Sequence, residues 1–286
     1  MTSFEKTVPS RRPRRTGRRG LRVLAAVVVS AGALVNATGA SAEPTGTSGS
    51  APVRPTVVLV HGAWADSGAW NEVVAGLQRD GYPVDVFPTP LQSLAGDSAA
   101  LRAFLGTVPG PVVLVGHSYG GAVVSDAATG LAGVQALVYL DAFAPDTGEP
   151  VAALAGSQSV LAGPDPTQVF GFAPAGTSSA TELYVLPQVF VSAFANDLPQ
   201  SLGRVLAATQ RPVTLEALGE PSTEPAWRTI PSWYEVGTLD KVIPPAQQRF
   251  MAQRAGAHVV EAPTSHLPMV SQPRTVVRTV EAAARG

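Results

Sequence analysis

The stretch that decides the fold is Val112-Val-Leu-Val-Gly116-His117-Ser118-Tyr119-Gly120-Gly121. It reads as an apolar strand, a Gly-x-Ser-x-Gly turn and the start of a helix. A serine at such a strand-to-helix corner has a strained backbone, and this conformation lifts its hydroxyl clear of the sheet. The pattern therefore predicts that Ser118 is a nucleophile.

The two glycines of this turn have a steric role. A Cβ atom at Gly116 or Gly120 is expected to collide with neighbouring backbone. The helix that begins after Ser118 points its positive N-terminal end at the site, which favours a developing oxyanion. A bare Gly-x-Ser-x-Gly is common by chance, but its place between a strand and a helix favours a nucleophile over an ordinary turn serine.

Short apolar runs rich in β-branched residues alternate with helix-like segments on both sides of this corner. Continuous apolar strands with helices between them indicate a mostly parallel sheet, covered by helices on both faces. The predicted strands are 56–60, 84–87, 112–115, 136–140, 232–236 and 258–261, and the predicted helices are 69–80, 97–105, 119–129, 245–255 and 273–284. Asp97 is the expected N-cap of its helix. The chain is therefore expected to be an α/β protein.

The alternation stops between about residues 145 and 231. This insertion is rich in proline and glycine and shows no clear strand. A structureless loop of about 85 residues is improbable inside a compact domain, so a small helical cap over one end of the sheet is favoured over a loosely packed loop. The insertion also holds six aromatic residues that indicate an apolar cavity, although none of them is assigned to the site: Phe170, Phe172, Tyr184, Phe190, Phe194 and Trp227.

A serine hydroxyl needs a base to take its proton, and histidine is the usual one. The chain has four histidines. His117 is expected to point away from its neighbour Ser118, His61 is expected to serve through its backbone, and His258 reads as a packed strand residue. His266 lies in a loop between the last predicted strand and the last predicted helix. Elimination and position together predict His266 as the base.

An acid is expected to hold the imidazole in one tautomer and to stabilise its charged form. The chain order Ser, Asp or Glu, His places this acid between Ser118 and His266, at the end of a strand. Asp240 fits because its segment runs off a predicted strand into a loop. Asp141 also follows a predicted strand and is the competing assignment, whereas Glu235 is expected within its strand.

An oxyanion needs preorganised N–H donors, each contributing about 3 kcal/mol to lowering the barrier. The backbone N–H of Tyr119 is the first predicted donor. Ala63, in the loop after the first strand, is the second, with Gly62 allowing that loop to fold tightly. Trp64 and Trp70 have two open interpretations: they line the mouth of the site, or they anchor the first helix in the core.

The N-terminus has the pattern of a secretory signal peptide. Residues 1–42 carry eight basic side chains and one acidic one, and a mainly apolar run of about 15 residues follows the basic part, short of the ~20 that span a bilayer. Ala40-Ser41-Ala42 is a small-x-small cleavage pattern, so cleavage is expected near Ala42. The Arg18-Arg19 pair leaves general and twin-arginine export both open. Residues 43–55 read as a flexible linker, and residues 56–286 as the folded domain.

Composition excludes several other classes. The chain has no cysteine, which removes disulfides, thiolate nucleophiles and zinc–cysteine sites. Residues 43–286 carry 12 basic and 20 acidic side chains, a net charge of −8, which argues against nucleic-acid partners and anionic membrane surfaces. No stable membrane insertion, metal or organic cofactor is expected. The oligomeric state is open, with a monomer as the default.

Three stretches resemble the α/β-hydrolase superfamily, in particular the branch of plant methylesterases and hydroxynitrile lyases with related small bacterial esterases. These stretches are His61-Gly-Ala-Trp64 with Gly68-Ala-Trp70, the Gly116–Gly121 turn, and Asp240-Lys-Val-Ile-Pro-Pro245 with Ser265-His-Leu-Pro-Met269. The resemblance covers about residues 56–284. It implies Ser118, Asp240 and His266 as nucleophile, acid and base, Ala63 and Tyr119 as oxyanion donors, and a cap before the strand at 232–236.

One position departs from the lyases of that branch. They have a lysine directly after the catalytic histidine, and it stabilises departing cyanide, whereas this chain has Leu267. We therefore expect a secreted serine hydrolase that cleaves carboxylic esters of small to medium apolar molecules through an acyl-enzyme. A lyase or C–C bond hydrolase that uses the same three residues is the alternative within enzymes. A ligand-binding protein without turnover is the alternative outside them.

Overall fold

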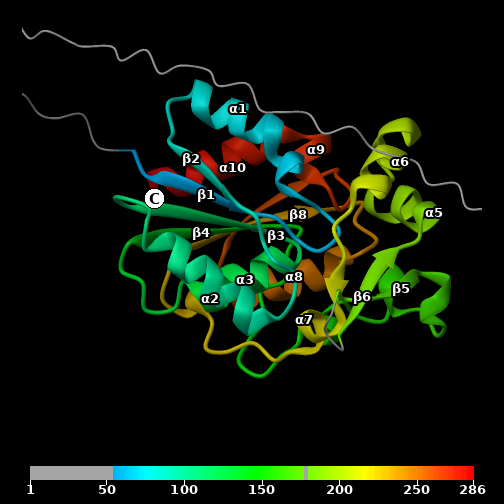
Figure 1. The fold of residues 1–286 in the computed structure, drawn as a ribbon. Coiled ribbons are helices and arrows are strands. Elements are labelled where there is room, and N and C mark those ends of the chain that lie inside the picture. Colours follow the sequence, from blue (N-terminus) through cyan, green and yellow to red (C-terminus); the bar gives the residue numbers. More distant parts are fainter. Residues whose placement is uncertain (1–53, 177–179) are drawn as a thin grey trace, which may run out of the picture. The chain divides into compact units, whose positions relative to one another are not determined.

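The computed structural model describes residues 54–176 and 180–286. The predicted signal peptide, 1–42, and all but the last two residues of the predicted linker lie outside this part. The described residues form a six-stranded sheet in the order β2-β1-β3-β4-β8-β9, with every neighbouring pair parallel (Figure 1). The strands are β1 Thr56–Val60, β2 Val84–Phe87, β3 Val112–His117, β4 Val134–Leu140, β8 Ser232–Gly237 and β9 His258–Ala262. The predicted parallel α/β sheet is confirmed.

Helices cover both faces of the sheet, as the continuous burial of β1, β3 and β8 requires. Figure 1 shows α1 and α10 on one face and α2, α3 and α8 on the other. Their bounds are α1 Asn71–Arg79, α2 Leu94–Leu105, α3 Tyr119–Ala127, α8 Pro245–Arg254, α9 Pro268–Ser271 and α10 Pro273–Arg285, with a 3-10 turn η1 at Ser67–Trp70.

Two local predictions are wrong. The N-cap of α2 is Ser93, whose Oγ accepts from Gly96 N–H at 3.1 Å, and not Asp97, which lies in the first turn. Gly96, a weak helix former, disguised this earlier start in the sequence. His258 is exposed rather than packed, because β9 is an edge strand of the sheet. Its ring lies beside that of Trp233, with the centroids 4.9 Å apart.

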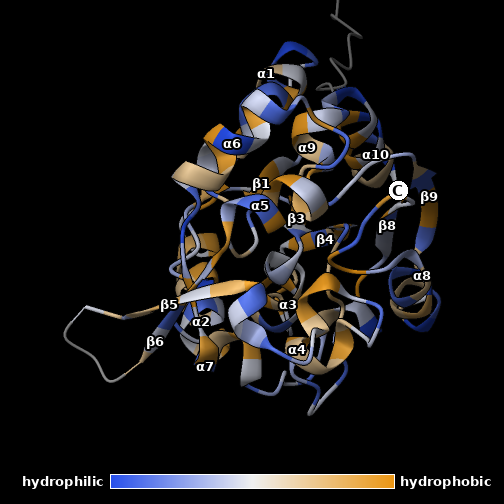
Figure 2. Ribbon diagram, turned by 90° about the vertical axis from the view of Figure 1, so that its right-hand side faces the viewer, coloured by the Kyte–Doolittle hydropathy of each residue, from blue (hydrophilic) through white to orange (hydrophobic). Residues whose placement is uncertain are grey.

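The insertion between β4 and β8 folds into short elements, and it is not purely helical. Three of its strands form an antiparallel sheet in the order β5-β6-β7, which corrects the expectation of a helical cap without strands. The strands are β5 Phe170–Pro174, β6 Thr181–Val185 and β7 Val213–Thr214. Their sequence signal is weak because they are short and because β5 ends on a proline and contains Gly171. Much of β5 is coloured hydrophobic in Figure 2, and its Phe170 is buried.

We call the whole insertion between β4 and β8 the cap. Its other elements are helical, and most of them are single turns. They are α4 Val151–Leu154, η2 Val160–Ala162, η3 Pro166–Gln168, α5 Pro187–Val189, η4 Phe190–Phe194, α6 Gln200–Thr209, α7 Leu215–Gly219 and η5 Ala226–Arg228. The η4 turn is a π-helix, a form that is rare and often found at functional sites. Among the described residues, no helix is both long and apolar enough to cross a membrane.

A buried carboxyl group lies between the sheet and α10. Glu235 of β8 is fully buried, and its Oε2 accepts from Thr279 Oγ at 2.7 Å, while its Oε1 has no partner. Burial raises the pKa of Glu235 to about 7, against 4.5 for the exposed group. The folded protein therefore binds more protons than the unfolded chain between these two values. Stability falls as pH rises through that window, and the loss persists above it.

We predict that Glu235→Gln weakens this pH dependence. Between pH 4.5 and pH 8 the wild type should lose up to roughly 3 kcal/mol of unfolding free energy that the variant keeps, because glutamine does not ionise. Urea denaturation at both pH values measures the difference. Glu72→Gln, which alters an exposed carboxylate on α1, is the matched control. Equal pH dependence of wild type and Glu235→Gln would refute the prediction.

Candidate active site

Ser118 lies at the corner between β3 and α3 in a strained conformation, with φ +53° and ψ −125°. The corner is compact because glycines allow close backbone approach. A Cβ on Gly116 would lie 2.6 Å from the carbonyl oxygen of Gly120, and a Cβ on Gly120 would lie 2.6 Å from that of Val60. These contacts are the steric roles expected from the sequence, and they hold Ser118 against the end of β1.

The structure brings together the three side chains that the sequence analysis selected. Ser118 Oγ lies 2.8 Å from His266 Nε2, and His266 Nδ1 lies 2.8 Å from Asp240 Oδ2. Asp240 follows β8 and His266 follows β9. The imidazole and carboxylate side chains are fully buried. The result is one continuous line of hydrogen bonds from hydroxyl to imidazole to carboxylate.

Asp240 is held in one orientation. Its Oδ1 accepts from the N–H groups of Val242, at 2.7 Å, and Ile243, at 3.0 Å. Its Oδ2 accepts from Gln248 Nε2 at 2.8 Å, in addition to its contact with His266. Since the carboxylate accepts at His266 Nδ1, this network assigns the imidazole proton to Nδ1 and leaves Nε2 free to accept from Ser118. Gln248 is fully buried on α8, and no signal in the sequence singled it out.

Asp141, the competing acid, has a different partner. It follows β4 with φ +42°, is fully buried, and its Oδ1 accepts from Gly237 N–H at 2.5 Å. Burial, together with the nearby Asp240 carboxylate, raises the pKa of Asp141 well above its usual value. The hydrogen bond to His266 Nδ1 comes from Asp240 and not from Asp141.

His117 supports the loop that carries His266. Its Nε2 donates to the backbone carbonyl of His266 at 2.7 Å, and the two ring centroids are 5.0 Å apart. Burial lowers the pKa of His117 well below its usual value, so the ring is neutral. From the sequence, this side chain was expected to point away from Ser118, and no contact with His266 was expected.

His61 ties down the loop after β1 through its side chain as well as its backbone. Its Nε2 accepts from Thr89 N–H at 3.1 Å, and Thr89 Oγ1 donates to His61 O at 3.1 Å. Burial lowers the pKa of His61 to about 4, which keeps Nε2 an acceptor at neutral pH. Only a backbone role was expected from the sequence.

Ala63 and Tyr119 both line the pocket next to Ser118. Tyr119 is the first residue of α3, so its N–H has no acceptor within the helix. The loop that holds Ala63 is packed against the corner, because a Cβ on Gly62 would lie only 2.5 Å from Ser118 Cβ. The phenol of Tyr119 points elsewhere and donates to Asp97 Oδ2 at 2.9 Å.

Each of the two interpretations of the tryptophans holds for one of them. Trp64 lines the pocket with φ +58°, and its indole N–H donates to Leu183 O at 2.9 Å. Trp70 is fully buried in the core, and its ring contacts that of His117. Trp64 is therefore a wall of the site, whereas Trp70 is a core anchor.

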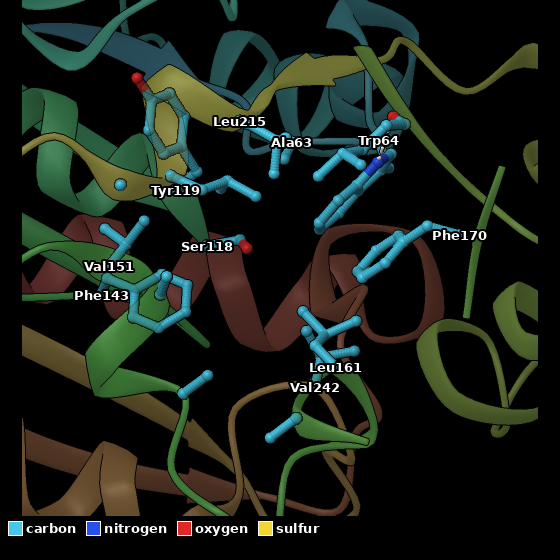
Figure 3. A pocket seen from close by; sticks show the side chains of 16 residues that line it. Ala63, Trp64, Ser118, Tyr119, Phe143, Val151, Leu161, Phe170, Leu215 and Val242 are labelled. Atoms are coloured by element: carbon cyan, nitrogen blue, oxygen red, sulfur yellow. Dashed lines mark hydrogen bonds between the residues drawn. The ribbon is translucent and has the colours of Figure 1, made fainter. Parts of the chain in front are cut away.

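Above Ser118 lies a cavity of about 290 Å³. In Figure 3 the serine hydroxyl lies between Phe143 and Val151 on one side and Trp64 and Phe170 on the other. The rings of Trp64 and Phe170 stack at 5.6 Å. The lining residues are Ala63, Trp64, Ser118, Tyr119, Phe143, Val151, Ala152, Ala155, Leu161, Ala162, Phe170, Leu183, Leu215, Leu218, Gly219 and Val242. Ten of these belong to the cap, so cap packing decides the shape of the cavity.

The lining of this pocket offers few polar side-chain groups to a ligand. No lining side chain is charged, and the indole N–H of Trp64 and the hydroxyl of Tyr119 are already hydrogen-bonded within the protein. Ser118 Oγ is the polar side-chain atom of the lining that can meet a ligand, beside the backbone N–H groups of Ala63 and Tyr119. Residues 54–176 and 180–286 contain no group of three or more His, Cys, Asp or Glu side chains arranged to hold a metal ion.

The comparisons with known proteins agree with this fold. A model of the alpha/beta hydrolase family matches residues 57–279. The chain belongs to this family. An extracellular alpha/beta-hydrolase from a Paenibacillus species, described as sharing structural and functional homology with tobacco salicylic acid binding protein 2, has a similar structure. The TM-score is 0.69 at 20% identity, over 81% of this chain and all of that one.

Two curated relatives have similar sequences. A carbendazim hydrolyzing esterase of Nocardioides sp. (strain SG-4G) is 37% identical over 111 residues, which cover 34% of this chain and 46% of that protein. The chain thus matches about half the length of this relative. The alpha/beta hydrolase nvfD of Aspergillus novofumigatus (strain IBT 16806) is 28% identical over 253 residues, covering 81% of this chain and 97% of that one.

We predict that Gly120→Ala damages both stability and the reactivity of Ser118. The new Cβ meets backbone oxygen of Val60, which cannot move without shifting β1, so unfolding free energy should fall by about 3 kcal/mol. Labelling of Ser118 by a fluorophosphonate should slow at least about tenfold, because the corner must open.

Gly133→Ala is the matched control, because a Cβ there meets nothing within 4 Å. It should change neither quantity appreciably. For both variants, thermal unfolding measures the change in stability, and the rate of fluorophosphonate labelling measures the reactivity of Ser118. If Gly120→Ala behaves like Gly133→Ala, the close approach at the corner is not the constraint that we describe.

Proposed function

We propose that this protein is a serine hydrolase that cleaves neutral, apolar carboxylic esters through an acyl-enzyme. The observation that carries the proposal is the buried line Ser118 Oγ–His266 Nε2–His266 Nδ1–Asp240, with both contacts at 2.8 Å and the hydroxyl opening into an apolar cavity. The esterase activity named for the Nocardioides relative supports the same reaction class.

Acylation begins when Ser118 Oγ attacks the ester carbonyl carbon and its proton passes to His266 Nε2. The charge that develops on the carbonyl oxygen is stabilised by the backbone N–H groups of Ala63 and Tyr119. Asp240 stabilises the imidazolium and keeps its proton on Nδ1. When the tetrahedral intermediate collapses, the C–O bond breaks and His266 returns the proton to the departing alcohol.

Deacylation repeats this route with water. His266 Nε2 takes a proton from water, whose oxygen attacks the acyl carbon, and the same two N–H groups hold the oxyanion. Collapse breaks the bond to Ser118 Oγ, which recovers the proton from His266, and the carboxylic acid leaves. Neither half of the cycle requires a group beyond the protein, the ester and water.

The lining of the cavity supports a substrate without charge. A carboxylate or ammonium group placed there would lose its hydration without gaining a partner, because the polar side-chain atoms of the wall are already hydrogen-bonded. The residue after His266 points the same way: Leu267 is buried and apolar and supplies no cation to a departing cyanide. This favours ester hydrolysis over cyanohydrin cleavage.

We also propose that the protein is exported. This proposal rests on the sequence of residues 1–42, with its basic start, its apolar run and its small-x-small pattern at Ala40–Ala42. Amino-terminal sequencing of the protein collected outside the cell should begin at Glu43. Recovery of the full chain from the cell interior would refute export.

We predict that Ser118→Ala abolishes turnover of a p-nitrophenyl ester series from acetate to dodecanoate. The rate constant kcat should fall by about 10⁴- to 10⁶-fold while the protein stays folded, since the nucleophile is lost without a change in packing. Asp240→Asn should lower kcat about 10⁴-fold, because it favours the wrong imidazole tautomer. Steady-state kinetics with residues 43–286 measure both.

Ser201→Ala, at an exposed position of α6, is the matched control and should hydrolyse the esters like the wild type. Wild-type turnover in Ser118→Ala would overturn the assignment of the nucleophile. No hydrolysis of any ester by the wild type, with Ser118 still labelled by a fluorophosphonate, would point to C–C or amide bonds. Absence of both would point to a binding protein.

A second prediction concerns the length of the acyl chain of the ester substrate. Ala155 lines the cavity at the end of α4, so Ala155→Phe should fill part of it and lower kcat/KM for octanoate and longer esters at least about tenfold. Acetate hydrolysis should change little. Ala153→Phe, on the exposed side of the same helix, should leave the chain-length profile unchanged. A profile that is identical in Ala155→Phe and wild type would place the acyl chain elsewhere.

A further inference from the structure

One segment of the cap contacts both loops that carry the candidate acid and base. It consists of the π-helical turn η4 and the three residues after it, residues 190–197, and we call it the η4 segment. It belongs to the insertion, and it lies more than forty residues from Asp240 and almost seventy from His266 along the chain. Nothing in the sequence pattern connects it to the site.

The strongest contact is a carboxylate that binds the residue before His266. Asp197 Oδ2 accepts from Ser265 N–H at 2.9 Å, and Asp197 Oδ1 accepts from the Ser265 hydroxyl. The same hydroxyl lies 2.9 Å from the carbonyl oxygen of Phe194, but its single proton favours the charged acceptor. Ser265 is fully buried. Both oxygens of Asp197 are thus committed to one residue of the base loop.

The same segment contacts the imidazole ring itself. Phe194 meets His266 edge-on, with centroids 5.2 Å apart and the planes at 86°. Phe194 also stacks on Phe190 at 5.0 Å and meets Trp64 at 5.6 Å. Phe194 therefore packs against the pocket wall, its own π-helical turn and the imidazole of His266 at the same time.

Weaker contacts reach the acid loop on either side of Asp240. Lys241 Nζ donates to Ser192 O at 3.1 Å, and Asn196 Nδ2 donates to Leu239 O at 3.4 Å. These side chains are exposed, so each contact adds little by itself. They show that the η4 segment contacts the loop after β8 as well as the loop after β9.

The base loop is consequently held from two sides. From the core, His117 Nε2 donates to the carbonyl of His266. From the cap, Asp197 fixes the N–H and hydroxyl of Ser265, the residue before it. With a bond on each side of its Cα atom, His266 has little freedom to move away from Ser118. A displacement of about 1 Å at such a group costs about 100-fold in rate.

We propose that Asp197 is a positioning residue for the base: acting through Ser265, it holds His266 at hydrogen-bonding distance from Ser118. The proposal rests on the proposed function, because it takes His266 as the base. It also assigns the cap a second role besides shaping the pocket, since the η4 segment completes the support of the catalytic loop.

The test compares Asp197→Ala and Asp197→Asn with wild type. Asp197→Ala should lower kcat about 10- to 100-fold with less than about a threefold change in KM, because the pocket is intact while the base is displaced. Asp197→Asn keeps one acceptor oxygen and should fall between Asp197→Ala and wild type. The fluorophosphonate labelling rate of Ser118 should fall in parallel with kcat, without requiring a substrate.

A structural readout separates positioning from general destabilisation. The Nδ1 proton of a buried histidine bonded to a carboxylate gives a strongly deshielded proton NMR signal. This signal, from His266, should broaden or shift in Asp197→Ala and persist in the control. The control is Glu149→Gln, which removes a different cap carboxylate: Glu149 binds Arg254 of α8 at 2.7 and 2.8 Å and touches neither loop of the triad.

The outcomes are distinguishable. If Asp197→Ala and Glu149→Gln lower Tm alike and both retain wild-type kcat, labelling rate and NMR signal, Asp197 is only structural and the proposal is overturned. If wild type hydrolyses no ester but labels at Ser118, the proposed substrate fails while the labelling rates still decide the role of Asp197. If wild type neither hydrolyses nor labels, the proposed function and this inference fall together.

Discussion

The close approach of backbone segments at the β3–α3 corner is the constraint on which the rest of the site depends. Gly116 packs against Gly120, Gly120 against Val60, and Gly62 against Ser118, all at distances where a Cβ has no room. These contacts hold Ser118 in its strained conformation and bring the loop of Ala63 beside it. Ser118 and both expected oxyanion donors are thus located by backbone packing, and side chains then add the candidate base and acid.

The order of the strands creates the remaining requirement. Ser118 follows β3, whereas the candidate acid follows β8, two strands away, and the candidate base follows the edge strand β9, three strands away. The loop that carries His266 must therefore reach past β8 and β4 and be held there. His117 supports it from the core and the η4 segment from the cap. The cap therefore has two roles: it lines the cavity, and its η4 segment supports the loop that carries His266.

Much of this was accessible from the sequence because it depends on local patterns. The buried strands, the strained serine and the loop positions of Asp240 and His266 follow from periodicity, turn chemistry and chain order. The errors have two kinds of cause. The N-cap at Ser93 and the short strands of the cap were obscured locally, by Gly96 and by the glycine and proline of β5. The exposure of His258 depends instead on the position of β9 at an edge of the sheet.

By itself, the sequence determined a parallel α/β fold with a nucleophile corner, because glycine spacing and apolar periodicity act over a few residues. It also placed the candidate base and acid in loops and favoured Asp240 over Asp141. Only the tertiary structure showed which carboxylate contacts His266, closed an apolar cavity with cap residues, and brought Asp197 to Ser265. The physical reason is that hydrogen bonds and packing between distant segments depend on distances that the packed fold alone sets.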